Sequence, residues 1–122
     1  MARIMIVDDS PTDVLNLKAM LVKAGHTVTE ASSGEAAISR IKIEKPDCVI
    51  MDVVMPPGVN GFQATRTISK DPATAHIPVL VVSSKNQETD RVWALRQGAK
   101  DYIVKPVKEA DLIAKVKAAI GG

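Results

Sequence analysis

The chain has 122 residues, of which 46% are apolar and 25% are charged, and its formal net charge is +2. A chain of this length normally forms one domain with a buried core, so we expect a single domain over residues 1–122. The aromatic content of 2% and the small net charge argue against a nucleic-acid-binding protein. The single cysteine excludes an internal disulfide. No apolar run approaches the ~18 residues of a membrane span, and no signal peptide pattern opens the chain, so we expect a cytoplasmic protein without membrane insertion.

Five short runs with strand character alternate along the chain with longer amphipathic segments. The strand-like runs cover residues 3–7, 27–31, 48–51, 79–82 and 102–104. Most of them are apolar throughout and rich in β-branched residues, which is typical of strands covered on both faces of a parallel sheet.

The amphipathic segments between these runs carry signals for helix starts and stops. Ser10 followed by Pro11 reads as an N-cap and a proline at the first helical position, and Ser32 with Glu35 fits a capping box. The predicted starts of the five helices are Ser10, Ser32, Asn60, Thr89 and Lys108. Five repeats of strand and helix predict right-handed crossovers and a doubly wound α/β fold with a parallel sheet.

Polar side chains follow four of the five predicted strands. Asp8 and Asp9 come after the first, Asp52 after the third, Ser83 after the fourth and Lys105 after the fifth. In a doubly wound sheet the ligand site lies beyond the carboxyl ends of the strands. We therefore expect these side chains to converge at one edge of the sheet.

Such a group of side chains favours phosphoryl transfer assisted by a divalent ion. Clustered carboxylates repel one another, and Mg²⁺ is the hard cation that one or two carboxylates and phosphate oxygens hold. A carboxylate beside the metal, here Asp52, can then attack a phosphoryl group in line. Lys105 supplies a fixed positive charge, and Ser83 supplies a hydrogen-bond donor for a phosphoryl oxygen.

These residues resemble the response-regulator receiver domain family, and the resemblance extends over essentially the whole chain. The matching motifs are Asp8-Asp9, Asp52-Val53-Val54-Met55-Pro56, Val82-Ser83 and Lys105-Pro106. The resemblance implies a flavodoxin-like (CheY-like) fold with five helices and a five-stranded parallel sheet in the order 2-1-3-4-5. It also implies a single receiver domain without an output domain.

The resemblance further implies a role for each matched residue at the metal. Asp52 would be the phosphoacceptor, and Asp9 and Asp52 would ligate Mg²⁺. Asp8 would assist largely through water, and the backbone carbonyl of Val54 would complete the ligands from the protein.

Two further roles concern the phosphoryl group and the response to it. Lys105 would contact the phosphoryl group, and the Lys105-Pro106 peptide is typically cis in this family. Ser83 and Tyr102 would form a switch pair, in which Ser83 turns toward the phosphoryl group and Tyr102 swings inward. An extra residue at Pro56-Pro57 departs from the family's pattern, in a loop beside the acceptor.

A narrower resemblance connects the chain to single-domain regulators of the PilH type, which act in chemotaxis-like control of type IV pili and twitching motility. It lies in residues 7–12, 60–66 and 87–93. The implied partner is a histidine kinase as phosphodonor, and the implied assembly is a monomer or weak dimer that binds no nucleic acid.

Three other classes compete with this interpretation. A flavodoxin-like electron carrier would need a hydroxyl-rich phosphate loop and aromatic walls, whereas Asp8-Asp9 occupies that loop. An Mg²⁺-dependent phosphohydrolase would place its nucleophile after the first strand, usually as Asp-x-Asp, and would need a cap over its substrate. A receiver fold that only binds partners would not require the complete set of acids and lysine.

Overall fold

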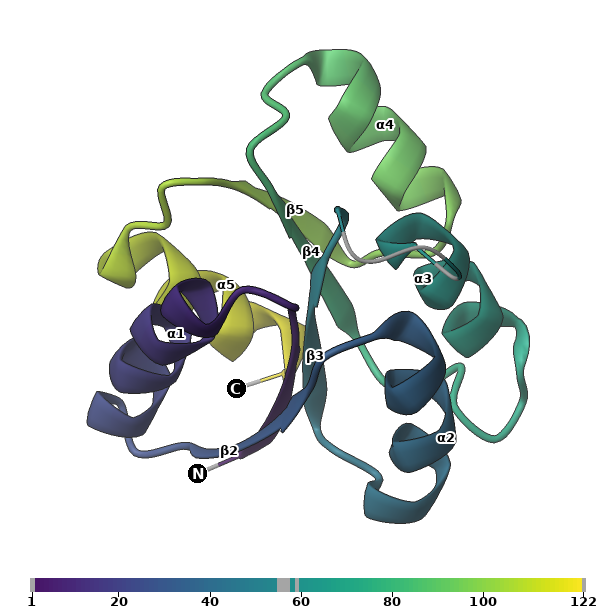
Figure 1. Ribbon diagram of the computed structural model, residues 1–122, viewed down its shortest axis with the longest axis horizontal. Coiled ribbons are helices and arrows are strands. Elements are labelled where there is room, and N and C mark those ends of the chain that lie inside the picture. The colour runs from purple at the N-terminus through teal and green to yellow at the C-terminus, as the bar shows by residue number, and fades with distance from the viewer. Residues whose placement is uncertain (1, 55–57, 59, 122) are drawn as a thin grey trace.

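The computed structural model describes residues 2–54, 58 and 60–121 of the chain. Within these residues, five parallel strands form one sheet in the order β2-β1-β3-β4-β5 (Figure 1). The predicted fold class and strand order are therefore confirmed. The predicted departure at Pro56-Pro57 lies outside the described residues.

The strands and helices alternate without exception along the described chain. They are β1 (Arg3–Val7), α1 (Pro11–Lys23), β2 (Thr27–Ala31), α2 (Gly34–Glu44), β3 (Cys48–Asp52), α3 (Gly61–Lys70), β4 (Val79–Ser83), α4 (Glu88–Arg96), β5 (Asp101–Val104) and α5 (Glu109–Ala119). Every predicted strand matches an observed one, and three observed strands are one residue longer because ladder hydrogen bonds continue at one end.

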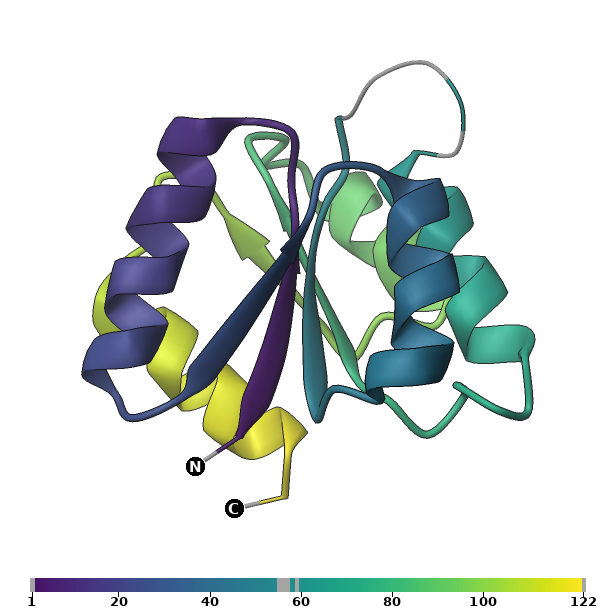
Figure 2. The same ribbon diagram turned by 60° about the horizontal axis from the view of Figure 1, so that its bottom comes forward.

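The helices cover both faces of the sheet, which explains why the central strands are apolar throughout. Helices α1 and α5 pack on one face, and α2, α3 and α4 lie on the other (Figures 1 and 2). Successive side chains of a strand point to opposite faces. Ile4 and Ile6 of β1 accordingly join the cluster under α1 and α5, while Met5 and Val7 join the cluster under α2 and α3.

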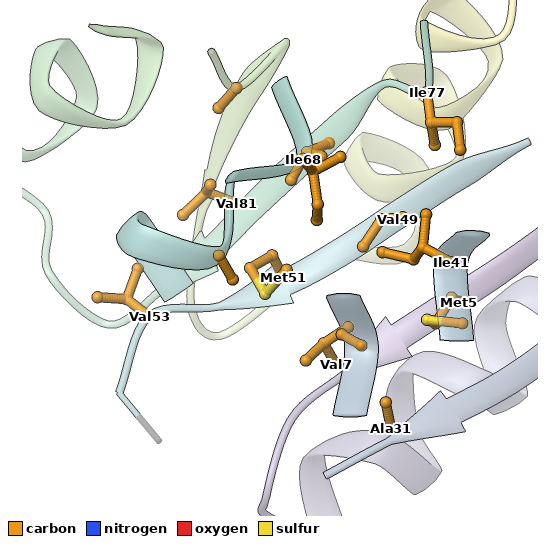
Figure 3. Close-up of a cluster of buried hydrophobic side chains, with 14 of the residues drawn as sticks. Met5, Val7, Ala31, Ile41, Val49, Met51, Val53, Ile68, Ile77 and Val81 are labelled. Atoms are coloured by element: carbon orange, nitrogen blue, oxygen red, sulfur yellow. The ribbon is translucent and has the colours of Figure 1, made fainter. Parts of the chain in front are cut away.

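Figure 3 shows the second of these clusters between the sheet and the helices. Met5, Val49 and Met51 of the central strands meet Ile41 of α2 and Ile68 of α3 there. All five side chains are almost completely buried. On the other face Cys48 is buried as well, and burial raises the pKa of its thiol to about 12. Cys48 therefore behaves as a small apolar side chain.

Two of the predicted helix starts differ from the observed N-caps, by one residue in α2 and by two residues in α4. The N-cap of α2 is Ser33 rather than Ser32, because the extended backbone of Ser33 lets its hydroxyl accept a hydrogen bond of 3.1 Å from the Ala36 N–H. Helix α4 begins at Glu88 rather than Thr89. Its N-cap is Gln87, whose backbone N–H donates to the Asp90 carboxylate at 3.2 Å.

The carboxyl ends of the strands lie at one edge of the sheet, toward the top of Figure 2. The helices α1 and α2 begin at this edge, directly after β1 and β2. Among the described residues, no helix has both the length and the apolar character needed to cross a bilayer.

Candidate functional site

Three aspartates lie together at the carboxyl edge of the sheet. Val7 of β1 pairs with Met51 of β3, so Asp8 and Asp52 follow side by side on adjacent strands. One carboxylate oxygen from each of Asp8, Asp9 and Asp52 lies within 4.8 Å of the others. Asp8 and Asp52 are buried, whereas Asp9 is exposed. The structure thus brings together acids that are 43 residues (Asp9 and Asp52) and 44 residues (Asp8 and Asp52) apart in the sequence.

The short connection between β1 and α1 fixes the first of these acids. The Ser10 backbone N–H donates to Asp8 Oδ1 at 2.9 Å, and the Ser10 hydroxyl accepts from the Asp13 N–H at 3.3 Å. Ser10 therefore caps α1 as predicted and also holds the Asp8 carboxylate in place.

Lys105 reaches the same cluster from the connection after β5. Its backbone N–H donates to the Ser83 carbonyl at 2.8 Å, and the Lys105-Pro106 peptide is cis. The Lys105 ammonium lies 3.2 Å from Asp52 Oδ1 and 3.4 Å from Asp8 Oδ2. The predicted convergence of Lys105 with the acids is present in the structure.

The charges in this cluster shift the affinity of its members for protons. Burial, followed by the neighbouring Asp8 carboxylate, raises the pKa of Asp52 to about 6, while Lys105 acts in the opposite direction. Burial disfavours the Lys105 ammonium, but the carboxylates of Asp13, Asp52 and Asp8 outweigh it and raise the Lys105 pKa. Asp52 thus carries its charge at neutral pH only against a free-energy cost.

The predicted switch residues lie one and two strands away from Asp52. Asp52 pairs with Val82, so the buried Ser83 is the next residue along β4. Its hydroxyl accepts from the Lys85 N–H at 3.1 Å. The Tyr102 hydroxyl donates to the Lys85 carbonyl at 2.8 Å. The backbone of Lys85 therefore connects the two side chains.

Tyr102 already lies inward in this structure, and its expected swing on phosphorylation stays a prediction. The Tyr102 side chain is already buried, with 3% of the residue exposed, and it belongs to the core cluster under α2 and α3. The reason is that the Lys85 carbonyl satisfies the hydroxyl in the inward position, so the ring is buried at no cost in lost hydrogen bonds. Any response of Tyr102 must start from this inward position.

Val54 lies two residues beyond Asp52, where β3 has ended. The residue is 63% exposed. The assignment of its backbone carbonyl as a metal ligand stays a prediction.

Two residues near the site were not identified from the sequence. Asp13 forms the shortest contact of the Lys105 ammonium, at 2.8 Å, although the sequence suggested only an acid in the first turn of a helix. Gly61 lies against the end of β3, where an added Cβ would be 2.0 Å from the Asp52 carbonyl oxygen. The only sequence signal for Gly61 was its place beside the Asn60 cap, which says nothing about this approach.

The donor set suits a hard divalent cation. Three carboxylates in mutual reach, two of them buried, offer oxygen ligands and excess negative charge, which is what Mg²⁺ binds in proteins. One ammonium offsets only part of this charge.

The strand order, together with an acidic cluster and a lysine at the carboxyl edge of the sheet, defines the class of protein. The model of the response regulator receiver domain family matches residues 4–117. The chain therefore belongs to the response regulator receiver domain family, as its sequence motifs predicted.

Two curated relatives show which members of this family the chain resembles. Protein PilH of Pseudomonas aeruginosa is 54% identical over 122 residues, and the match spans 100% of both chains. This likeness confirms the narrower resemblance. The response regulator PleD of Caulobacter vibrioides is 36% identical over 117 residues, which are 96% of this chain but 26% of PleD.

Solved structures agree with the fold. A response regulator from Chloroflexus aurantiacus superimposes with a TM-score of 0.94 at 30% identity, over 99% of this chain and 98% of that one. The receiver domain of the sensor histidine kinase PA1611 from Pseudomonas aeruginosa gives a TM-score of 0.90 at 29% identity, with the same coverage. That domain was crystallised with a magnesium ion coordinated in its active site cleft.

Proposed function

We propose that this protein is a stand-alone response regulator that accepts a phosphoryl group on Asp52 from a histidine kinase. The observation that carries the proposal is the convergence of Asp8, Asp9 and Asp52 with the Lys105 ammonium at the carboxyl edge of the sheet. In this proposal residues 1–122 form one receiver domain, which is a phosphoacceptor rather than an enzyme that turns over a separate substrate.

The acids would hold Mg²⁺ as the cofactor. Asp9 and Asp52 would be direct ligands with the Val54 carbonyl, and Asp8 would contribute largely through water. Bound there, the ion would neutralise negative charge on the incoming phosphoryl group.

Phosphorylation would be a direct transfer between two nucleophiles. A carboxylate oxygen of Asp52 attacks the phosphorus of a phosphohistidine, so that an O–P bond forms while the P–N bond breaks. The electron pair of the broken bond stays on the imidazole, which takes a proton from solvent. Lys105, 3.2 Å from Asp52 Oδ1, is placed to donate to a phosphoryl oxygen and to offset its charge.

The response would begin at Ser83. Its hydroxyl already accepts from the Lys85 N–H, and on phosphorylation it would donate its own proton to a phosphoryl oxygen. Such a hydrogen bond to a charged group contributes ~1.5–3 kcal/mol. A shift of two states from 1:99 to 99:1 requires ~5.5 kcal/mol. Ser83 alone is therefore insufficient, and Lys105, the metal and repacking must contribute the rest.

The change at Ser83 would then pass through Lys85 to the face formed by α4, β5 and α5, which would bind a protein partner. Because the Lys85 carbonyl accepts from the Tyr102 hydroxyl, any movement of this segment toward the phosphoryl group changes the partner of Tyr102. The face formed by α4, β5 and α5 would change shape as a result.

The biological setting follows from the similarity to PilH. We infer a cytoplasmic regulator in a chemotaxis-like pathway that controls type IV pilus twitching motility. It would act as a monomer or weak dimer and bind no nucleic acid.

Mass spectrometry after incubation with acetyl phosphate and Mg²⁺ tests the proposed acceptor. The wild-type protein is expected to gain about 80 Da, the mass of one phosphoryl group, and Asp52→Asn is expected to gain none. Asp111→Asn, which changes an exposed aspartate of α5, is the matched control and should be phosphorylated like the wild type. A mass gain that persists in Asp52→Asn would refute the assignment.

A further inference from the structure

The shortest contact of the Lys105 ammonium joins it to a residue outside the acidic cluster. Its distance to Asp13 Oδ2 is 2.8 Å, against 3.2 Å to Asp52 and 3.4 Å to Asp8. The Asp13 side chain is 39% exposed, whereas those of Asp52 and Asp8 are 8% and 2% exposed. Asp13 is thus a more solvated partner that competes with the two buried acids for the same cation.

The backbone fixes the Asp13 carboxylate in relation to the cluster. Asp13 lies in the first turn of α1, where its N–H donates to Ser10 Oγ, and the Ser10 N–H donates to Asp8 Oδ1. Lys105 completes a closed chain of hydrogen bonds by donating to both Asp13 and Asp8. The cap therefore fixes the Asp13 backbone beside the cluster, and the short side chain keeps its carboxylate within reach of Lys105.

Lys105 faces two requirements that conflict. Its ammonium must stay near Asp52 to meet a phosphoryl group, yet a full ion pair with Asp52 and Asp8 would neutralise the charge that a divalent cation needs. Asp13 stands outside the group of acids whose oxygens lie within 4.8 Å of one another in the described chain. It can therefore bind the ammonium without using up a carboxylate of the cluster.

The surroundings leave room for the Lys105 ammonium to lie nearer Asp13 than the acids of the cluster. A cavity of about 140 Å³ lies beside the pair, between α1 and the segment after β5. It is lined by Asp13, Asn16, Leu17, Met20, Lys105, Pro106 and Val107. Lys105 therefore borders open space on this side.

We propose that Asp13 is a positioning residue for Lys105, which holds the ammonium at the margin of the cluster and so keeps Asp8 and Asp52 available to Mg²⁺. This inference rests on the proposed function. It assigns to an acid of the first helical turn an effect on metal affinity that is exerted through the lysine.

A double-mutant cycle on Mg²⁺ affinity separates this effect from simple charge attraction. Isothermal titration calorimetry at 0.15 M salt would compare the wild type with Asp13→Asn, Lys105→Gln and the double variant. Asp13→Asn is expected to weaken Mg²⁺ binding roughly tenfold, in the range found for residues that orient metal ligands. With Lys105→Gln in place, the same substitution is expected to cost at most about threefold, because only the screened attraction of its charge remains.

Two control variants sharpen the comparison. Glu109→Gln removes a carboxylate that also lies in the first turn of a helix and pairs with a lysine, Lys23, at 3.4 Å; its Mg²⁺ affinity should match the wild type. Asp13→Glu restores the charge and is expected to recover most of the affinity.

The possible failures can be told apart. An equal loss in both Lys105 backgrounds, or no loss at all, would overturn the positioning role while leaving the proposed function intact. A wild-type protein that binds no Mg²⁺ and gains no phosphoryl mass would overturn the proposed function and this inference together.

Discussion

Asp52 carries a negative charge in surroundings that disfavour it. Its side chain is 8% exposed and lies beside Asp8, and the Lys105 ammonium that contacts it is shared with Asp8 and Asp13. Burial and the Asp8 carboxylate raise the pKa of Asp52 to about 6 for these reasons. The same features that make Asp52 receptive to a cation therefore lower the stability of the metal-free fold.

Because the buried charge of Asp52 lowers the stability of the metal-free fold, Asp52→Asn is expected to stabilise the protein in a way that depends on pH. The pKa of Asp52 rises on folding from an ordinary value near 3.8 to about 6, so between these values the native state binds more protons than the unfolded state. Stability therefore falls as the pH rises through this window. Without metal at pH 7, Asp52→Asn is expected to raise the free energy of unfolding by about 1–3 kcal/mol, and the gain should fade below about pH 4.

Urea denaturation in EDTA at pH 3.5, 5 and 7 measures this difference. Asp111→Asn removes the charge of an exposed aspartate that pairs with the partly buried Lys115 at 3.5 Å, and it should change stability by less than about 0.5 kcal/mol at every pH. A difference between wild type and Asp52→Asn that is constant with pH would contradict the explanation.

Among the elements, the connection from β3 to α3 depends on a close approach of two backbones. Helix α3 begins at Gly61, after the Asn60 cap, and the Gly61 N–H donates to the Val53 carbonyl at 3.2 Å. An added Cβ would lie 2.0 Å from the Asp52 carbonyl oxygen and 2.8 Å from Val53 Cα. Both are backbone atoms, so no flexible side chain can move aside.

Gly61→Ala is therefore expected to displace either α3 or the end of β3. Overpacking of this kind costs about 1–3 kcal/mol or more, and because Asp52 is the last residue of β3, phosphorylation by acetyl phosphate should slow as well. Thermal unfolding and the rate of mass gain measure the two effects.

Gly121→Ala is the matched control for this substitution. Apart from the adjoining backbone, no heavy atom of the described residues lies within 4 Å of its added Cβ, although its φ of +77° is unfavourable for alanine. Its φ alone should cost about 1–2 kcal/mol, and phosphorylation should be unchanged. Equal effects of the two substitutions would show that the contact with β3 is unimportant.

Across the whole molecule, the site is assembled from connections that follow three different strands. Asp8 and Asp9 follow β1, Asp52 ends β3 and Lys105 follows β5, and the order of the sheet sets their separation. A cation that binds the acids after β1 and at the end of β3 at once binds only the folded state. Its binding free energy is therefore added to the stability of the entire fold.

Mg²⁺ is accordingly expected to stabilise the wild-type protein against unfolding. At a free concentration of 100 times its Kd the gain should be about 2.7 kcal/mol, and Asp52→Asn should lose most of it. Denaturation with Mg²⁺, and with NaCl at matched ionic strength, separates binding from general screening. Equal stabilisation of both proteins would place the ion elsewhere.

The fold, and the identity of the polar residues at the carboxyl edge of the sheet, were predictable from the sequence because both depend on local patterns. Apolar runs mark strands buried on two faces, and the residue after each run must lie at the carboxyl edge of a parallel sheet. The cap at Ser10 and the start of α3 after Asn60 were predictable for a similar reason, since capping involves residues three apart. The caps at Ser33 and Gln87 were missed because neighbouring residues offered equally good local signals.

The sequence by itself determined which chemical groups the site contains, since strand ends and residue types can be read along the chain. Only the tertiary structure decided how Asp8, Asp13 and Asp52 share the Lys105 ammonium, how closely Gly61 approaches Asp52 and that Tyr102 is already buried. These features depend on distances between segments that are tens of residues apart. Such distances are set by the packing of helices on the sheet, and no local pattern records them.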